Sequence, residues 1–175
     1  MQQHFYRYNQ QLTYICKIMG QEFTVRAAKK EDCAAVLKLI QELATYENAS
    51  REAELDVATL EKDGFGAQPA YQLLIAEKEN KVIGMALFYE KYSTWKGRSI
   101  YLEDLIVTEK ERGIGAGKAL FEAVIQEAKR RNSGRMEWQV LDWNQPAIDF
   151  YKKAGAELDD EWINCKFRRE DLQNR

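Results

Sequence analysis

The chain has 175 residues, of which 45% are hydrophobic and 31% are charged, and its formal net charge is −2. This size and composition predict one folded domain with a sizeable core and argue against disorder. The near-neutral charge gives no electrostatic footprint for nucleic acid, and no apolar run reaches the length of a membrane span. We therefore expect a cytoplasmic protein with neither a nucleic-acid nor a membrane partner.

Histidine and cysteine usage limits the chemistry that the chain can perform. The only histidine is His4, so the domain itself can form neither a Ser–His or Cys–His catalytic pair nor a histidine-based zinc site. The three cysteines form no CxxC motif and are odd in number, which favours free thiols in a reducing compartment; they are Cys16, Cys33 and Cys165. We expect no metal site, and any general base must be a carboxylate, a tyrosine, a lysine, a thiolate or a relayed water.

The first half of the chain predicts strands and helices in alternation. Residues 1–20 are rich in glutamine and tyrosine, and we interpret them as an extension before a single domain over residues 21–175. Residues 23–27 alternate like an edge strand, and residues 32–46 have helical periodicity. A second short helix over residues 55–62 is expected to stop at Gly64.

Strands dominate the middle of the chain and helices return after it. Residues 71–77 and 81–92 are predicted as a hairpin across Glu79-Asn80, and residues 99–107 as the central strand. The main helix is expected over residues 115–131, with a buried stripe at Leu120, Phe121, Val124, Ile125 and Ala128. Further along, a strand is expected over residues 135–140, a helix over 145–154 and a last strand over 161–167.

A glycine-rich turn follows the predicted strand that ends at Val107. The run Arg112-Gly113-Ile114-Gly115-Ala116-Gly117 leads directly into the main helix. Glycine lets the backbone approach a ligand and adopt positive φ. The start of the helix offers free N–H groups and the positive end of its dipole to an anion. The turn therefore predicts a pyrophosphate site built from backbone amides.

Two common phosphate motifs do not match this turn. A P-loop needs glycine five residues before the Gly-Lys pair and Ser or Thr after it, whereas this chain has Arg112 and Ala119 there. The dinucleotide fingerprint needs G-x-G-x-x-G, whereas the spacing here is G-x-G-x-G. The pattern Arg-x-x-Gly-x-Gly after a strand instead resembles the acetyl-CoA loop of the GNAT superfamily of N-acetyltransferases.

Further segments extend this resemblance from about residue 23 to about residue 167. Asn144 followed by a helix and Phe150-Tyr151-x-x-x-Gly155 is similar to the second half of the family. Residues 42–47 and 60–66 resemble the diamine and polyamine acetyltransferase branch, and residues 92–98 and 140–145 resemble its thialysine-acetylating members. The resemblance implies an α+β fold with a mixed, mostly antiparallel sheet, splayed where acetyl-CoA binds and covered by helices on both faces. It also implies a homodimer.

The resemblance implies roles for particular residues. Acetyl-CoA would be held by the strand end, the glycine turn and the start of the later helix, at Leu105, Ile106, Val107, Arg112, Gly113, Ile114, Gly115, Ala116, Gly117, Lys118, Asn144, Gln145, Pro146 and Ala147. Glu103 would be the catalytic base, through a water, and Tyr151 the general acid at the CoA sulfur. The amine would be bound by Tyr46, Glu47, Ser93, Trp95, Glu103, Glu137, Trp138 and Gln139.

Several of these residues also have simpler interpretations. Asn144 can serve as a helix N-cap, and Tyr151 as a core residue. Because neighbouring strand residues point to opposite faces, only one of Glu103 and Asp104 is expected to face the site, with Asp104 paired to a backbone or basic group.

The resemblance implies a small amine as the substrate, and two kinds of amine are candidates. Polyamine acetylators carry an acidic residue where this chain has Ser93, and Lys96 and Arg98 nearby suit a carboxylate. These features favour a lysine-like amine such as thialysine, or a diamine, over spermidine. A protein acetyltransferase and a CoA-binding module without turnover remain alternatives.

Overall fold

A computed structural model describes residues 22–175, so the extension expected over residues 1–20 lies outside the described part. The chain forms two compact units, Met1–Trp138 and Gln139–Arg175, and each is described by itself. Among residues 22–175 there is no helix with the length and apolar character that crossing a bilayer requires.

The first unit is built on a five-stranded sheet with the order β1-β2-β3-β4-β5. The first four strands pair antiparallel and β5 pairs parallel with β4, which confirms the mixed, mostly antiparallel sheet. The central strand of the sheet is β3, whereas the strand predicted to be central, residues 99–107, is its neighbour β4. The strands are β1 Thr24–Ala27, β2 Gln72–Lys78, β3 Lys81–Ser93, β4 Gly97–Val107 and β5 Met136–Glu137.

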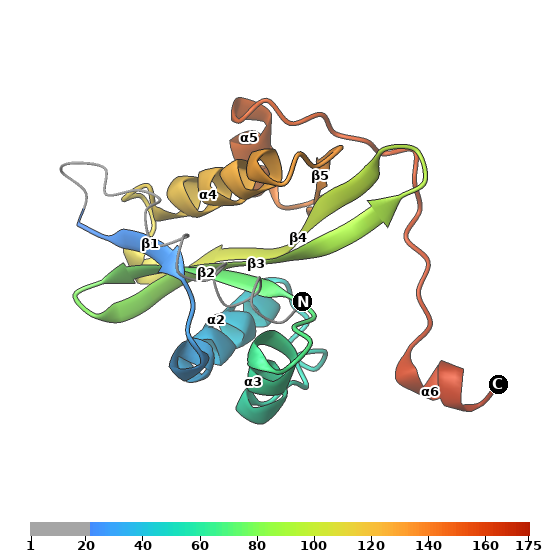
Figure 1. Ribbon diagram of the computed structural model, residues 1–175, viewed down its shortest axis with the longest axis horizontal. Helices are drawn as coiled ribbons and strands as arrows, with labels where there is room; N and C mark the ends of the chain where they lie inside the picture. Colours follow the sequence, from blue (N-terminus) through green and yellow to red (C-terminus); the bar gives the residue numbers. More distant parts are fainter. Residues whose placement is uncertain (1–21) are drawn as a thin grey trace. The chain divides into compact units, whose positions relative to one another are not determined.

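Helices cover both faces of this sheet (Figure 1). On one face lie α2 and α3, and α4 lies on the other. An apolar cluster joins α2 to the sheet and includes Val36, Leu39, Ile75, Met85 and Ile106. The helices of this unit are α2 Cys33–Tyr46, α3 Val57–Phe65 and α4 Ala116–Arg130, with short 3₁₀ turns η2 Lys30–Asp32 and η3 Glu109–Glu111.

Local sequence explains the turns of the first unit. Glu79 and Asn80 both have positive φ, 50° and 61°, as a two-residue hairpin turn requires, so the hairpin between β2 and β3 is confirmed. The expected stop of α3 at Gly64 is wrong, because the helix continues to Phe65. A Cβ at Gly64 would lie 2.5 Å from the Tyr71 ring, so this glycine gives room to a packed aromatic side chain.

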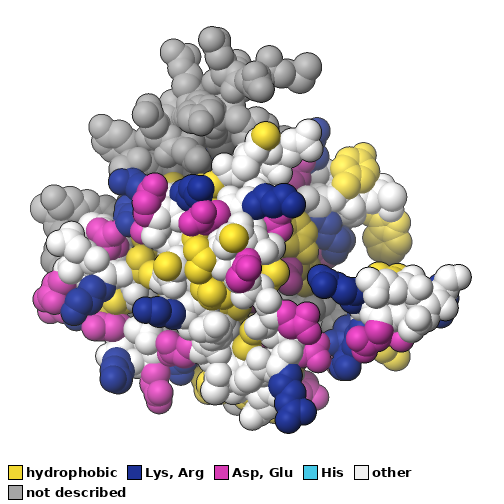
Figure 2. All heavy atoms as spheres, turned by 90° about the horizontal axis from the view of Figure 1, so that it is seen from below, with side chains coloured by type: hydrophobic (Ala, Val, Ile, Leu, Met, Phe, Trp, Pro, Cys, Tyr) yellow, Lys and Arg dark blue, Asp and Glu magenta, His cyan; other side chains and the backbone are white. Residues whose placement is uncertain are grey.

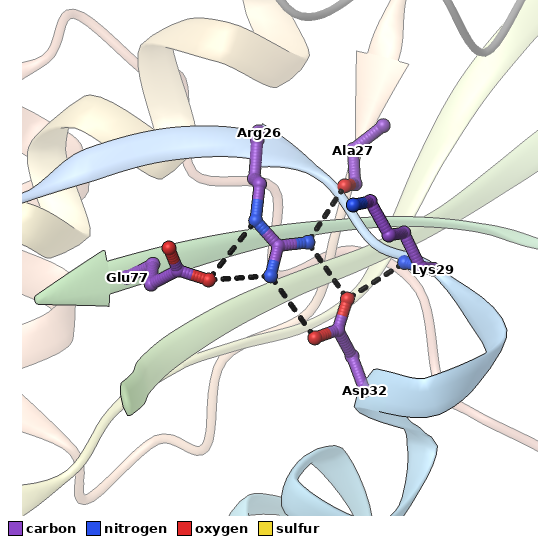
Figure 3. A network of polar contacts seen from close by, with 5 residues as sticks. All are labelled: Arg26, Ala27, Lys29, Asp32 and Glu77. Carbon is purple, nitrogen blue, oxygen red and sulfur yellow. Dashed lines mark hydrogen bonds and ion pairs between the residues drawn. The ribbon is translucent and has the colours of Figure 1, made fainter. Parts of the chain in front are cut away.

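Arg26 ties β1 to its neighbours in sequence and in the sheet (Figure 3). Its guanidinium contacts Asp32 at 2.7 Å and Glu77 at 2.5 Å, and Asp32 also accepts from the Lys29 amide at 2.7 Å. Burial alone would raise the pKa of Asp32, but the hydrogen bonds from Arg26 and Lys29 bring it below its usual value. The network fixes β1 and β2 to the start of α2.

The buried stripe of α4 agrees with its predicted residues except at Ile125, which is only partly buried. The stripe also contains a carboxylate that the periodicity did not indicate. Glu127 is 1% exposed and pairs with Arg130 at 2.7 Å and Arg131 at 2.5 Å. The basic residues at the end of α4 therefore neutralise a buried charge as well as facing the helix dipole.

The second unit contains α5 Gln145–Lys153 and α6 Arg169–Gln173. The strand predicted over residues 161–167 is wrong, because that segment has no regular structure and its apolar side chains are exposed. The strand expected over residues 135–140 is reduced to the two residues of β5. An alternating sequence forms a strand only where a neighbouring strand completes its hydrogen bonds.

Candidate active site

The glycine turn joins β4 to α4 through η3. Gly113 and Gly115 have φ of 85° and 90°, a conformation that side chains with a Cβ rarely adopt, and both are exposed. Gly115 is the N-cap of α4, and the first hydrogen bond of the helix runs from the Ala119 amide to the Gly115 carbonyl at 3.0 Å. The amides of Ala116, Gly117 and Lys118 therefore have no acceptor within the helix. The geometry suits an anion.

The open edge of β4 lies next to this turn in sequence. β5 pairs with β4 only at Ile100 and Tyr101, while β4 continues to Val107. In the first unit, no described strand pairs with residues 103–107 on that side. Leu105, Ile106 and Val107 thus present the strand edge that the resemblance assigns to the donor.

The second half of α2 contacts the turn before the glycines. Glu42 accepts hydrogen bonds from Thr108 Oγ1 at 2.9 Å and from the Glu109 amide at 2.8 Å. Arg112 donates from Nε to the Val107 carbonyl at 3.1 Å, and its guanidinium lies 5.4 Å from the centre of the Tyr46 ring. A cavity of about 480 Å³ is lined by residues of α2 together with Glu109 and Arg112.

A β-bulge at Glu103 changes the expected orientation of the two acidic residues of β4. Leu102 pairs with Phe88 and Asp104 with Leu87, so Glu103 is an extra residue opposite no partner of β3. Asp104 therefore shares a face with Leu87 and with the pair Tyr89–Tyr101. The expectation that Glu103 and Asp104 face opposite sides is wrong, because the bulge interrupts the alternation.

Leu87 belongs to the apolar cluster under α2, so this is the face of the sheet that α2 covers. Three carboxylates interact on this face. Burial, followed by the negative charges of Glu103 and Glu47, raises the pKa of Asp104 to about 6. Burial also raises the pKa of Glu47 at the end of α2. The basic or backbone partner expected for Asp104 is absent among residues 22–175. This acidic group favours a cation, because a positive charge would relieve the repulsion.

Two tyrosines accompany the carboxylates. The rings of Tyr89 and Tyr101 have centroids 5.3 Å apart on paired positions of β3 and β4. Burial, the charge of Glu103 and a hydrogen bond to Glu103 raise the pKa of Tyr89 to about 12. The Tyr89 hydroxyl therefore keeps its proton near neutral pH and donates it in a hydrogen bond to Glu103, which is itself exposed.

The β3–β4 turn uses Ser93 for its own structure. Ser93 is 7% exposed, and its Oγ accepts from the amides of Trp95 and Lys96, both at 3.2 Å. Trp95 itself is 77% exposed. Arg98 pairs with Glu90 on the neighbouring strand. The idea that Arg98 is available for a substrate carboxylate loses support, since it already has a carboxylate partner.

Glu137 and Trp138 are the last two residues of the first unit. Glu137 contacts Arg135 at 2.9 Å and Lys91 at 3.4 Å, and Lys91 also lies 5.3 Å from the Tyr101 ring centre. Trp138 packs edge-on against Phe121 with ring centroids 5.1 Å apart. Glu137 is thus neutralised within the sheet.

The remaining predicted residues belong to the second unit. Asn144 is the N-cap of α5, with its side chain accepting from the Ala147 amide at 3.3 Å, and Pro146 lies in the first turn. Gln145 donates to Asp149 at 2.7 Å, and Gln139 donates to Asn164 at 2.5 Å. Tyr151 is 8% exposed and contacts the Phe150 ring. The N-cap interpretation of Asn144 is confirmed.

Within residues 22–175 no group of three or more His, Cys, Asp or Glu side chains is arranged to hold a metal ion. The sequence did not predict three features of the site. They are the interaction of Asp104 with the carboxylates of Glu47 and Glu103, the Tyr89 hydroxyl and the hydrogen bonds of Glu42. A signal for Tyr89 was present, because it lies at the same alternation as Tyr101 across the hairpin. Neither the bulge nor the Glu42 contacts have a sequence signal.

Comparison with known proteins identifies the family. Residues 34–156 match the family described as "Acetyltransferase (GNAT) family". The chain is 41% identical over 141 residues to a protein named thialysine N-epsilon-acetyltransferase from Bos taurus, covering 76% of this chain and 83% of that protein. It is 37% identical over 160 residues to a human protein named spermidine/spermine N(1)-acetyltransferase-like protein 1, covering 86% of this chain and 23% of that one.

A solved structure confirms the fold. It is an integron cassette protein from the mobile metagenome of V. cholerae, with a TM-score of 0.73 and 24% identity over 89% of this chain and 98% of that one. This likeness confirms the predicted α+β fold, and the family match and the relative from Bos taurus confirm the acetyltransferase class. This chain belongs to the acetyltransferase (GNAT) family and is an acyltransferase.

Proposed function

We propose that this enzyme transfers the acetyl group of acetyl-CoA directly to a primary amine of a small molecule. A lysine-like amine such as thialysine is the first candidate, and a diamine is the second. The observation that carries the proposal is the group of three carboxylates Glu47, Glu103 and Asp104, because Glu103 and Asp104 lie on β4, the strand that leads through η3 into the glycine turn. One strand thus presents a cation-attracting surface and leads into an anion-binding turn.

The residues present fit acetyl-CoA. Gly113 and Gly115 have positive φ and are exposed, and the amides at the start of α4 are unpaired within the helix. The open β4 edge at Leu105, Ile106 and Val107 suits the amide groups of the pantetheine arm. From the second unit, we propose that residues 144–147 contribute. Acetyl-CoA supplies the acetyl group as an activated thioester.

The chain's own groups account for the proton movements. An alkylamine is mostly protonated near pH 7 and must lose a proton before it can attack. Asp104 and Glu47 hold the ammonium group, and Glu103 takes its proton through a water molecule. Tyr89 holds Glu103 by its hydroxyl. Tyr151 donates a proton to the sulfur that leaves.

Substrate preference rests on the relatives rather than on the pocket. The protein from Bos taurus is named for thialysine, and the human protein is named for spermidine and spermine. Arg98 and Glu137 are engaged within the sheet, so they give no free cation or anion for the far end of a substrate. Polyamine acetylation is the alternative after the lysine-like amine and the diamine, with protein acetylation and CoA binding without turnover behind it.

We also propose that residues 21–175 act as one acetyltransferase domain in the cytoplasm, working as a homodimer. The family match over residues 34–156 spans both units, which supports a single domain. The cytoplasmic location is proposed from the odd number of cysteines and the absence of a CxxC motif, which favour free thiols in a reducing compartment.

A panel of amines tests the function. Thialysine, ornithine, putrescine, spermidine and a lysine peptide are each assayed with acetyl-CoA while CoA release is followed. We expect thialysine to exceed spermidine several-fold in kcat/KM, and Tyr151→Phe to lower kcat with acetyl-CoA affinity nearly unchanged. CoA binding without acetylation of any amine would favour the binding module, and a preference for spermidine would favour the polyamine assignment.

A further inference from the structure

A carboxylate on α2 caps the turn that precedes the glycines. Thr108 is the N-cap of η3, yet its side chain makes no cap hydrogen bond within the turn. The free amide of Glu109 is instead satisfied by Glu42 Oε1 at 2.8 Å, and Oε2 of the same carboxylate accepts from Thr108 Oγ1 at 2.9 Å. The partner comes from 67 residues away in sequence. Such a distant cap sets the direction in which the turn leaves β4.

The same stretch of α2 holds the far end of this turn. Arg112, the last residue before the glycines, bonds back to the Val107 carbonyl and lies over the Tyr46 ring. Tyr46 is one helical turn from Glu42, so the two residues share a face of α2. Residues 108 and 112 are therefore both fixed from one helix. Beyond them, a Cβ at Gly113 would meet nothing within 4 Å, so the glycine itself is not held by close packing.

We propose that Glu42 is a positioning residue for the acetyl donor. Its two hydrogen bonds set the orientation of residues 108–112, and through them the aim of the amides at the start of α4. The inference rests on the proposed function of the glycine turn. It assigns Glu42 a part in donor binding without contact to the donor.

Substitution of Glu42 tests the proposal. Glu42→Ala removes both hydrogen bonds, and we expect the KM for acetyl-CoA and the Kd for CoA to rise about tenfold, the size of one to two lost hydrogen bonds. The kcat at saturating acetyl-CoA and the KM for the amine should stay within about twofold. Glu42→Gln should restore most of the affinity, because its amide can accept from the Glu109 amide and donate to the Thr108 hydroxyl. Thr108→Val, which removes one bond, should fall between.

Two further measurements separate positioning from general stability. Glu122→Ala is the matched control, since Glu122 is an exposed carboxylate on α4 that accepts from Gln126; its donor affinity should equal that of the unsubstituted enzyme. Amide hydrogen exchange without CoA should be faster at residues 109–117 in Glu42→Ala than in the control.

The outcomes are distinct. A lower melting temperature in Glu42→Ala with unchanged donor KM, CoA affinity and loop exchange would overturn the proposal. If Glu42→Ala does not fold, unchanged CoA affinity in Thr108→Val would overturn it. If the unsubstituted enzyme binds no CoA, the proposed function fails, while loop exchange still decides whether Glu42 holds the turn.

Discussion

Asp104 shows how a single residue departs from its expected part. Its sequence neighbours suggested a paired structural carboxylate, but the bulge at Glu103 turns it toward Glu47 and Glu103. Two negative neighbours and partial burial are unfavourable for folding and useful for attracting an ammonium ion. A protonated substrate amine would therefore bind beside Asp104, where it relieves the repulsion between the carboxylates.

Asp104→Asn should stabilise the protein, and increasingly so as pH rises. The pKa of Asp104 is raised to about 6 in the fold, above the ordinary value of 3.8, so the folded state binds more protons between these values. Stability due to this group is therefore lost as pH rises from about 4 to about 6. The gain in Asp104→Asn should reach up to about 3 kcal/mol at pH 8.

Urea unfolding at pH 4 and pH 8 measures this gain. Glu122→Gln, an exposed carboxylate on the helix of the opposite face, gives the background for removing a charge. An equal gain for Asp104→Asn at both pH values would contradict the raised pKa that burial and the charges of Glu103 and Glu47 give to Asp104.

At the scale of elements, the periodic patterns predicted the helices and the hairpin well. The sequence did not show which strands pair or in what register. The helices α2, α4 and α5 and the β2–β3 hairpin agree with their predicted ranges to within one or two residues, because their apolar spacing and turn residues are local signals. The strand expected over residues 161–167 failed because a strand depends on a distant neighbour. The bulge at Glu103 depends on the register between β3 and β4, which no local pattern contains.

Gly115→Val should weaken CoA binding by distorting the glycine turn where α4 begins. Gly115 has φ of 90° at the N-cap of α4, and a β-branched residue there must abandon this conformation. Calorimetry should give at least a tenfold weaker Kd for CoA. Gly97→Val is the matched control, because Gly97 also has positive φ, 75°, but lies in the β3–β4 turn. Equal weakening in both variants would show a general loss of fold rather than a local effect on the glycine turn.

Across the whole molecule, the site predicted from sequence is only partly assembled by one unit. The glycine turn, the β4 edge and Glu103 lie in the first unit, whereas Asn144 and Tyr151 lie in the second. Their roles toward acetyl-CoA remain predictions, since they came from the family pattern rather than from geometry. The surface seen from the α2 side carries acidic and basic side chains interspersed, in keeping with the net charge of −2 (Figure 2).

The last prediction concerns assembly. Exposed apolar side chains gather in the second unit, where Trp162 is 73%, Ile163 88% and Phe167 57% exposed. Leaving such side chains in water is unfavourable, and a second copy of the chain would bury them in a two-fold interface. Light scattering at micromolar concentration should therefore give about twice the chain mass of 20.4 kDa. Ile163→Asp should shift this mass toward the monomer, whereas Leu158→Asp, a less exposed position of the same unit, should not. A monomer in the unsubstituted protein would remove the dimer from the proposal and leave these side chains without a partner of the same chain.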